Sequence, residues 1–284
     1  MSYDTIERFL VESKYSPNTE DIYFRMISEG LDDLGDFSNL TPSQFKGWLS
    51  DHNTWGQSTT WLAYCAIRSF LKWKYGNDHP ALDLSIKRED AGPQRTLSVN
   101  QAKTVYSYLE NLTSDIGTRD LAIFSLLLDT GLRSSEICRL NRDNLNLDTR
   151  TLTVKVKGGD WGSAIYSEIT TEHLIDWLHT RENHAGETRA AFVGIKGIKP
   201  GTRITNSGLR VIVRRWGKRS EIGPLSPHDF RRTFATISTI LQAPTRLVQM
   251  AGRWSTLEEV ERYTRGLQLL EFDKYLPMRK VSRK

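Results

Sequence analysis

An arginine and a glutamate stand three residues apart in the segment Thr-Gly-Leu-Arg-Ser-Ser-Glu, which ends at Glu136. The glycine follows an apolar helical run, so we expect Arg133 and Glu136 at the start of the next helix, on one face. There Glu136 can orient the guanidinium of Arg133 or a neighbouring group. The commonplace alternative is a solvated ion pair worth about 0.2–0.5 kcal/mol.

A second basic group follows the helix-start signal Ser226-Pro227. Serine suits the N-cap and proline the first helical position, so His228 and Arg231 are expected one turn apart at a helix N-terminus. Free N–H groups and the positive end of the helix dipole make such a terminus favourable for a phosphate. The alternatives are a capping or core histidine and an ordinary surface arginine.

A tyrosine and a lysine complete the residues suited to phosphate chemistry. Tyr263 falls about two turns after a capping-box signal, and Trp254 precedes it by nine residues. Taken singly, a packing tyrosine and a core tryptophan are the simpler interpretations. Lys157 lies at the tip of an expected hairpin, where a side chain can reach a neighbouring groove. Lys155 lies two residues earlier on the same face.

The elements that must position these residues form two parts. Apolar residues at helical spacing predict four or five short helices that end near Tyr75, and a polar, aperiodic stretch containing Gly92-Pro93 follows. Beyond it we predict mostly helix and one antiparallel hairpin of strands 151–156 and 163–169. Further helices are predicted to begin at Ser98 and to cover 121–129, 171–178, 205–216, 227–241, 245–251 and 256–263.

These elements predict a mainly α chain with a small antiparallel β-hairpin or sheet. We expect a helical domain over residues 1–84, a linker over 85–95 and a second domain, with a C-terminal tail, over 96–284. Residues 1–90 hold 9 Lys and Arg against 14 Asp and Glu, whereas the remainder holds 30 against 20. A polyanion is therefore expected to bind the second domain.

Composition excludes several classes of protein. With 38% hydrophobic and 26% charged residues, the chain is neither fibrous nor disordered. No apolar run approaches the roughly 20 residues that a membrane helix needs, and the first residues lack a signal-peptide pattern. Cys65 and Cys138 lack metal-type spacing, so we expect a reducing, intracellular compartment.

In order and spacing, these segments together resemble the motifs of the tyrosine recombinase family of phage integrases and Xer-like chromosome-dimer resolvases. Thr-Gly-Leu-Arg-Ser-Ser-Glu is similar to the family's first arginine box, and Lys157 to its hairpin lysine. His228-Asp-Phe-Arg231 is similar to its His-x-x-Arg box, and Trp254 with Tyr263 to its terminal box. The resemblance covers roughly residues 95–265. It implies a helical, SAM-like core-site-binding domain followed by an α+β catalytic domain.

The resemblance implies cleavage and rejoining of DNA by transesterification. Tyr263 would attack the scissile phosphate and form a 3′-phosphotyrosyl link, which stores the bond energy so that rejoining needs no ATP. Arg133 and Arg231 would hold the phosphate with planar guanidinium forks. Lys157 would protonate the leaving 5′ oxygen, and His228 would act as a base or hydrogen-bond donor.

Two further residues receive supporting roles from the resemblance. Glu136 would support the first arginine, and Trp254, which replaces the histidine of most members, would pack the pocket and offer its indole N–H to the phosphate. The sequence has no Asp or Glu cluster suited to a two-metal site and no phosphate-binding Gly-x-x-x-x-Gly-Lys-[Ser/Thr] loop, so we expect no metal or other cofactor.

The expected partner is double-stranded DNA, clamped between the two domains by a homotetramer on two DNA sites, with an accessory DNA-bending protein as an option. Such a protein would be cytoplasmic and nucleoid-associated. Because no arm-binding domain precedes the helical bundle, we expect a simple recombinase acting on core sites. Arg68, Lys72 and Lys74 form either a local DNA contact or a solvated face. The apolar tail 266–278 is expected to dock on a neighbouring subunit or on its own.

Other functions remain open from sequence. A type IB topoisomerase-like relaxer would keep the chemistry but act as a monomer, without paired sites. A non-catalytic, sequence-specific DNA-binding regulator would bind DNA regardless of Tyr263. A scaffold without a nucleic-acid role conflicts with the basic second domain, and salt-dependent DNA affinity would distinguish it.

Overall fold

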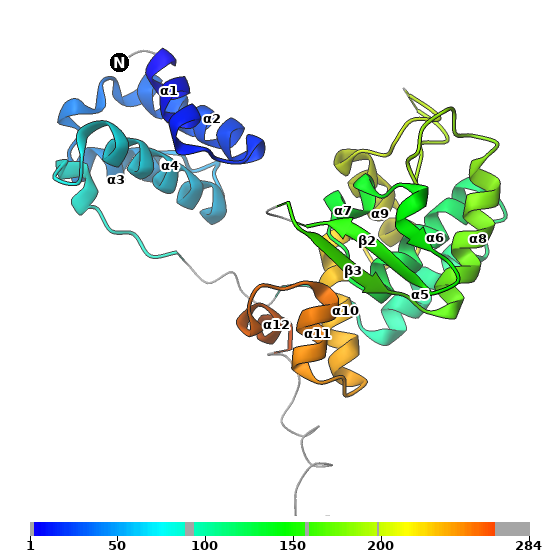
Figure 1. Ribbon diagram of the computed structural model, residues 1–284. Helices are drawn as coiled ribbons and strands as arrows, with labels where there is room; N and C mark the ends of the chain where they lie inside the picture. The colour runs from blue at the N-terminus through cyan, green and yellow to red at the C-terminus, as the bar shows by residue number, and fades with distance from the viewer. Residues whose placement is uncertain (1–2, 89–93, 157–158, 198, 265–284) are drawn as a thin grey trace, which may run out of the picture. The chain divides into compact units, whose positions relative to one another are not determined.

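The computed structural model describes residues 3–88, 94–156, 159–197 and 199–264, with the backbone alone for 262–264 (Figure 1). The chain divides into two compact units, Met1–Gly92 and Pro93–Lys284. Separate clusters of buried apolar side chains lie within the two units. Among the described residues, no helix has both the length and the apolar character needed to cross a bilayer.

The first unit is a bundle of α-helices joined by short 3-10 turns. Its elements are α1 (Tyr3–Ser13), α2 (Pro17–Leu34), η1 (Phe37–Asn39), α3 (Pro42–Asp51), α4 (Gln57–Tyr75) and η2 (Pro80–Asp83). The α3 helix begins where Thr41 and Gln44 form a capping box, and α4 ends before Gly76. The apolar faces of α2 and α4 pack together around the fully buried Ile27 and Ile67.

The structure describes the three basic residues of α4 for which a DNA contact or a solvated face is expected. Arg68 is partly buried, and its Nη1 donates hydrogen bonds to the carbonyl oxygens of Leu82 and Leu84. It fixes the segment that follows α4. Lys72 is exposed, whereas Lys74 is half-buried and lies over the ring of Tyr75.

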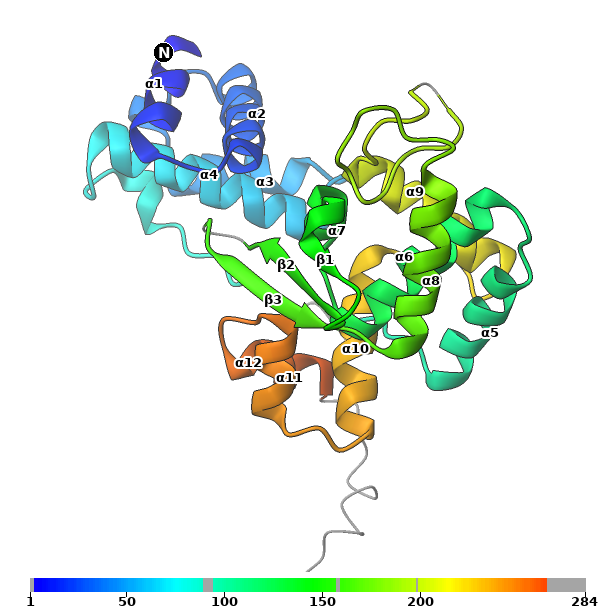
Figure 2. The ribbon, with the colours of Figure 1, turned by 45° about the vertical axis from the view of Figure 1, so that its right-hand side comes forward.

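The second unit is built largely of helices. They are α5 (Val99–Glu110), α6 (Asp115–Thr130), α7 (Ser134–Arg139), η3 (Arg142–Asn144), α8 (Glu168–Arg181), α9 (Asn206–Arg219), α10 (Pro227–Ile240), α11 (Thr245–Gly252) and α12 (Leu257–Thr264). The central helix is α6, which packs against α5, α8, α10 and a strand, so it is apolar on nearly every side. Figure 2 shows α10, α11 and α12 gathered on one side of the sheet.

A small antiparallel sheet completes this unit. It has the order β1 (Leu145–Asn146), β2 (Thr151–Lys155), β3 (Trp161–Ile165). In the register of β2 with β3, Thr153 faces Ser163, and the alternation of β2 buries Leu152 and Val154. The mainly α fold with a small antiparallel sheet is confirmed. The strand β1 was not predicted, and β3 ends before the predicted 169 because Ser167 caps α8.

Candidate active site

The end of α6 and the start of α10 meet at Gly131. This glycine has the left-handed φ of +56° that often ends helices, and a Cβ here would lie 2.6 Å from Cδ1 of Phe234. Its carbonyl oxygen accepts a 2.5 Å hydrogen bond from Nη1 of Arg231, which lies in the second turn of α10 and is 2% exposed. The two basic segments of the sequence are thus in contact.

The first arginine and its glutamate lie at the start of α7. Glu136 is buried; its Oε1 accepts a hydrogen bond from Nη1 of Arg133 at 2.9 Å, and its Oε2 accepts one from the Arg133 backbone N–H at 2.9 Å. The side chain of Arg133 remains 33% exposed. The expected contact between the pair is confirmed. The geometry leaves part of the Arg133 side chain accessible, while a buried carboxylate fixes its guanidinium.

Trp254 supports the second arginine. Its indole ring is buried, lies 4.3 Å from Cζ of Arg231 and stacks on Phe234 with ring centroids 6.1 Å apart. A Cβ on Gly252 would lie 1.8 Å from this ring, so a glycine is needed where the chain folds back. The packing role expected for Trp254 fits this geometry, in which its ring holds Arg231 on one face.

Arg253 belongs to this cluster although sequence reasoning missed it. Its Nη2 donates to the carbonyl oxygen of Thr130 at 3.1 Å and lies 3.5 Å from Oε2 of Glu136, and its Nη1 donates to the carbonyl oxygen of Ala251 at 2.7 Å. Burial lowers the pKa of Arg253, and the nearby Glu136 carboxylate opposes the shift. No spacing rule marks Arg253, because Thr130 and Glu136, its partners at the site, lie over one hundred residues earlier in the chain.

His228 lies in the first turn of α10, at the surface. Loss of solvent around part of its ring and then the charges of Arg232 and Arg231 lower its pKa, although the residue as a whole remains exposed. Arg133 also contributes to this shift, which places the ring within the field of both expected phosphate-holding arginines. A lowered pKa favours a neutral imidazole at pH 7, the form that can accept a proton.

Two expected site residues fall on parts that the structure does not describe. Lys157 lies outside the described residues, whereas its alternative Lys155 ends β2 and is exposed. Tyr263 lies in α12, but its side chain is outside the described part. The helix itself is anchored near the site, because Val260 is fully buried and packs with Phe234 and Trp254. The linker over 85–95 is described only in part, and the tail 266–278 not at all.

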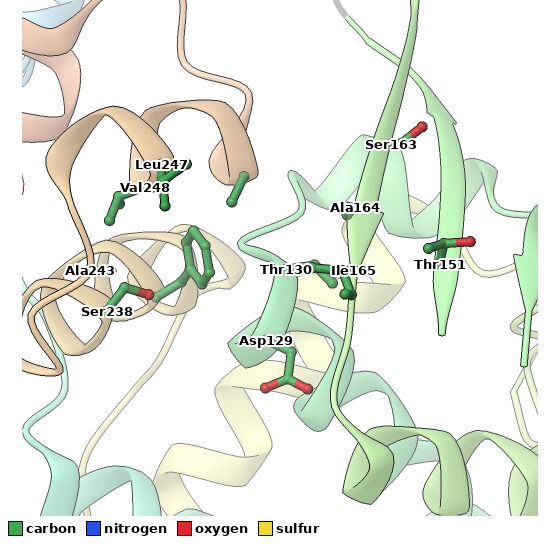
Figure 3. A pocket seen from close by; sticks show the side chains of 12 residues that line it. Asp129, Thr130, Thr151, Ser163, Ala164, Ile165, Ser238, Ala243, Leu247 and Val248 are labelled. Atoms are coloured by element: carbon green, nitrogen blue, oxygen red, sulfur yellow. The ribbon is translucent and has the colours of Figure 1, made fainter. Parts of the chain in front are cut away.

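A separate cavity of about 380 Å³ lies beside this cluster, between β3, the end of α6 and helices α10 and α11. Figure 3 shows Leu247 and Val248 on one side of it and Thr130 and Ile165 on the other. Its lining is mostly apolar, so it fits apolar side chains rather than a phosphate. Among the described residues, no three His, Cys, Asp or Glu side chains gather closely enough to hold a metal ion.

Comparisons with known proteins show what this chain is similar to. The sequence model of the phage integrase family matches residues 95–268. The tyrosine recombinase XerC of Corynebacterium glutamicum is 29% identical over 244 residues, which are 84% of this chain and 77% of the relative. That of Corynebacterium efficiens is 30% identical over 238 residues, 81% and 75% of the two chains.

Solved structures share the fold at lower identity. The recombinase XerH, bound to palindromic difH substrate in a post-cleavage complex, matches with a TM-score of 0.73 and 18% identity, over 93% of this chain and 78% of that one. A lambda integrase dimer bound to a COC′ core site matches with a TM-score of 0.73 and 14% identity, over 94% and 77%.

Proposed function

This chain belongs to the phage integrase family and is a tyrosine recombinase, and we propose that it cleaves and rejoins DNA through a 3′-phosphotyrosyl intermediate, without a metal ion or ATP. The observation that carries the proposal is the meeting of Arg231 with Gly131, two residues before Arg133, which brings two guanidinium groups from segments nearly one hundred residues apart to one site. Such forks match the oxygens of a phosphodiester.

The proposed reaction is an in-line displacement at phosphorus. The phenolic oxygen of Tyr263 forms a bond to phosphorus while the bond to the 5′ oxygen breaks. The tyrosine has a reference pKa near 10, so it gives its proton to a base, for which the neutral ring of His228 is suited. Lys157 supplies a proton to the leaving 5′ oxygen. The reverse reaction by another 5′-hydroxyl rejoins the strand and conserves the bond energy.

Arg133 and Arg231 stabilise the charge that grows on the non-bridging oxygens. Because Glu136 and Trp254 already fix these two guanidiniums, little reorganisation is needed as the charge develops. The cations of the chain then do the work that metal ions do in other phosphoryl-transfer enzymes.

Double-stranded DNA is the proposed substrate, taken mainly by the basic second unit, with residues 1–84 as the core-site-binding domain. Strand exchange requires four cleavages, so the active assembly is a homotetramer on two DNA sites, in the cytoplasm and at the nucleoid. The apolar cavity in Figure 3, with exposed Ile165 and Leu247 at its edge, offers a place where the tail 266–278 of the same or a neighbouring subunit can dock.

A nicked suicide duplex tests the chemistry. It carries the site that the protein selects from a pool of random duplexes, and the incubation contains EDTA and no ATP. Wild type is expected to form a covalent protein–DNA adduct, Tyr263→Phe none, and the control Tyr106→Phe, on surface helix α5, as much as wild type. An adduct in Tyr263→Phe, or a strict need for magnesium, would contradict the proposal. Relaxation of supercoiled plasmid lacking paired sites would favour the topoisomerase-like alternative.

A further inference from the structure

Arg253 has a backbone conformation that arginine seldom adopts. Its φ of +57° lies in the left-handed region, at the C-cap of α11, where glycine is the residue usually favoured. Strained positions of this kind concentrate at functional sites. We propose that Arg253 is a positioning residue that acts through Glu136 to set Arg133 against the scissile phosphate. The proposal rests on the recombinase function proposed above.

The guanidinium of Arg253 connects three elements. It reaches the carbonyl of Thr130 at the end of α6, the carboxylate of Glu136 in α7 and the carbonyl of Ala251 in α11. It also packs against β3, because a Cβ on Gly162 would lie 2.9 Å from its Cδ. These contacts use both terminal nitrogens on protein oxygens, and only 8% of the side chain is exposed. Arg253 is therefore placed to hold the site rather than to touch DNA.

The charge of Arg253 has a specific use beside Glu136. The carboxylate of Glu136 is 3% exposed, and a buried carboxylate needs compensation by a cation or hydrogen bonds. Its other cation, Arg133, is 33% exposed and is the residue assigned to the phosphate in the proposed reaction. When the positive charge of Arg133 interacts with a bound phosphate, the positive charge of Arg253 still offsets the negative charge of the Glu136 carboxylate. The Glu136 carboxylate can then continue to accept both hydrogen bonds from Arg133.

The neighbouring residue extends the link to the second arginine. Trp254 lies against Arg231, and the preceding residue, Arg253, reaches Arg133 through Glu136. Two consecutive residues are thus linked to both arginines of the site. Two residues separate Trp254 from the start of α12 at Leu257, the helix that carries Tyr263. Loss of Arg253 is therefore expected to misplace the phosphate relative to its arginines. Misplacement by about 1 Å can reduce a rate by roughly 10²-fold.

The substitution Arg253→Gly tests the proposal, because glycine accepts the positive φ while the guanidinium is lost. Single-turnover adduct formation on the suicide duplex is expected to slow by about 10–100-fold, with DNA affinity within about twofold of wild type. Arg150→Gly is the matched control, since Arg150 is exposed and has a φ of +54°. It should cleave at the wild-type rate. A wild-type rate in Arg253→Gly would overturn the proposal.

A double-mutant cycle separates positioning through Glu136 from a merely structural role. If Arg253 acts through the carboxylate, Arg253→Gly combined with Glu136→Gln should cleave no more slowly than the slower single variant. Rate losses that multiply would overturn the proposal. Arg253→Lys, which keeps a cation beside Glu136 but loses the fork, should cleave at an intermediate rate.

A readout independent of cleavage keeps this proposal distinct from the proposed function. The Arg133 N–H donates to Glu136 Oε2, the oxygen next to Arg253, so its hydrogen exchange should accelerate in Arg253→Gly and not in Arg150→Gly. Unchanged exchange would overturn the link, whatever the activity. An absence of adduct in wild type, with accelerated exchange in Arg253→Gly, would remove the recombinase chemistry but support the link from Arg253 to Arg133.

Discussion

Glu136 is a single buried carboxylate beside two guanidiniums, those of Arg133 and Arg253, and Arg231 lies near the same helix junction. Positive charge therefore exceeds negative charge within the cluster. An anionic phosphate would offset this excess, and the partial exposure of Arg133 gives it access. A site whose cations are fixed before substrate arrives stabilises a charged transition state with little reorganisation.

The pH dependence of stability tests the environment of His228. Its pKa is lowered in the folded protein, so between that value and the ordinary value of about 6.5 the unfolded chain binds more protons. Stability contributed by the neutral ring is therefore present above about pH 6.5 and lost as pH falls through this window. In urea unfolding, wild type should lose stability relative to His228→Gln between about pH 7 and 5. A difference that stays constant from pH 8 to 5 would contradict the shift.

The residues that sequence could identify are those whose partner is close along the chain. Arg133 with Glu136 is set by one helical turn, and His228 with Arg231 by another. The place of Arg253 in the site was not predicted, because its contacts depend on how α6, α7 and α11 pack. No local sequence pattern indicates that packing. The contact between the Trp254 ring and Arg231 could not be predicted for the same reason, although the sequence places Trp254 in the terminal motif.

The site depends on the junction between helices α6 and α7. The α6 helix ends at Thr130 and α7 begins at Ser134, so the short turn between them presents both the carbonyl of Gly131 to Arg231 and the side chain of Arg133. The start of α10 is closed by Asp229, whose carboxylate accepts the backbone N–H of Ser226 at 2.8 Å. This cap fixes the turn that carries His228.

Gly131→Ala is the corresponding prediction. A Cβ would meet Phe234 at 2.6 Å, and alanine does not favour a φ of +56°, so we expect a loss of stability of about 1–3 kcal/mol. Adduct formation should fall as well, because the displaced carbonyl oxygen no longer accepts the hydrogen bond from Arg231. Gly186→Ala is the matched control in the same unit, since nothing lies within 4 Å of its Cβ position. Equal unfolding midpoints for the two variants, measured by circular dichroism, would contradict this account.

Elements were predictable where the apolar period was long or where a cap marked the boundary. The N-cap at Ser98 and the start of α10 at Pro227 were predicted this way. The strand β1 has only two residues, too few for an alternating pattern, and exists because it pairs with β2. The strand β3 ends earlier than the apolar pattern predicted, because Ser167 is the N-cap of α8.

The two units, which have separate cores, carry opposite net charge. The first 90 residues have a net charge of −5 and the rest +10. In the first unit, Nη1 of Arg68 donates hydrogen bonds to carbonyl oxygens of its own chain, whereas Lys72 is exposed. Sequence could give this division because charge and polarity are read from composition alone, whereas which cations remain accessible is decided by packing.

Salt dependence of DNA affinity tests that division. Each phosphate neutralised adds about −0.9 to the slope of log K against log salt, so six contacts would weaken binding by about 10³-fold between 50 and 200 mM salt. We expect a fragment of residues 93–284 to keep the greater part of the full-length slope, and residues 1–92 to show little. Fluorescence anisotropy with a labelled duplex measures the slopes, and circular dichroism confirms that each fragment is folded. If residues 1–92 carried most of the slope, the second unit would not be the main phosphate-binding surface. Accessible basic residues on the acidic unit would then determine phosphate binding more than the net charge of each unit does.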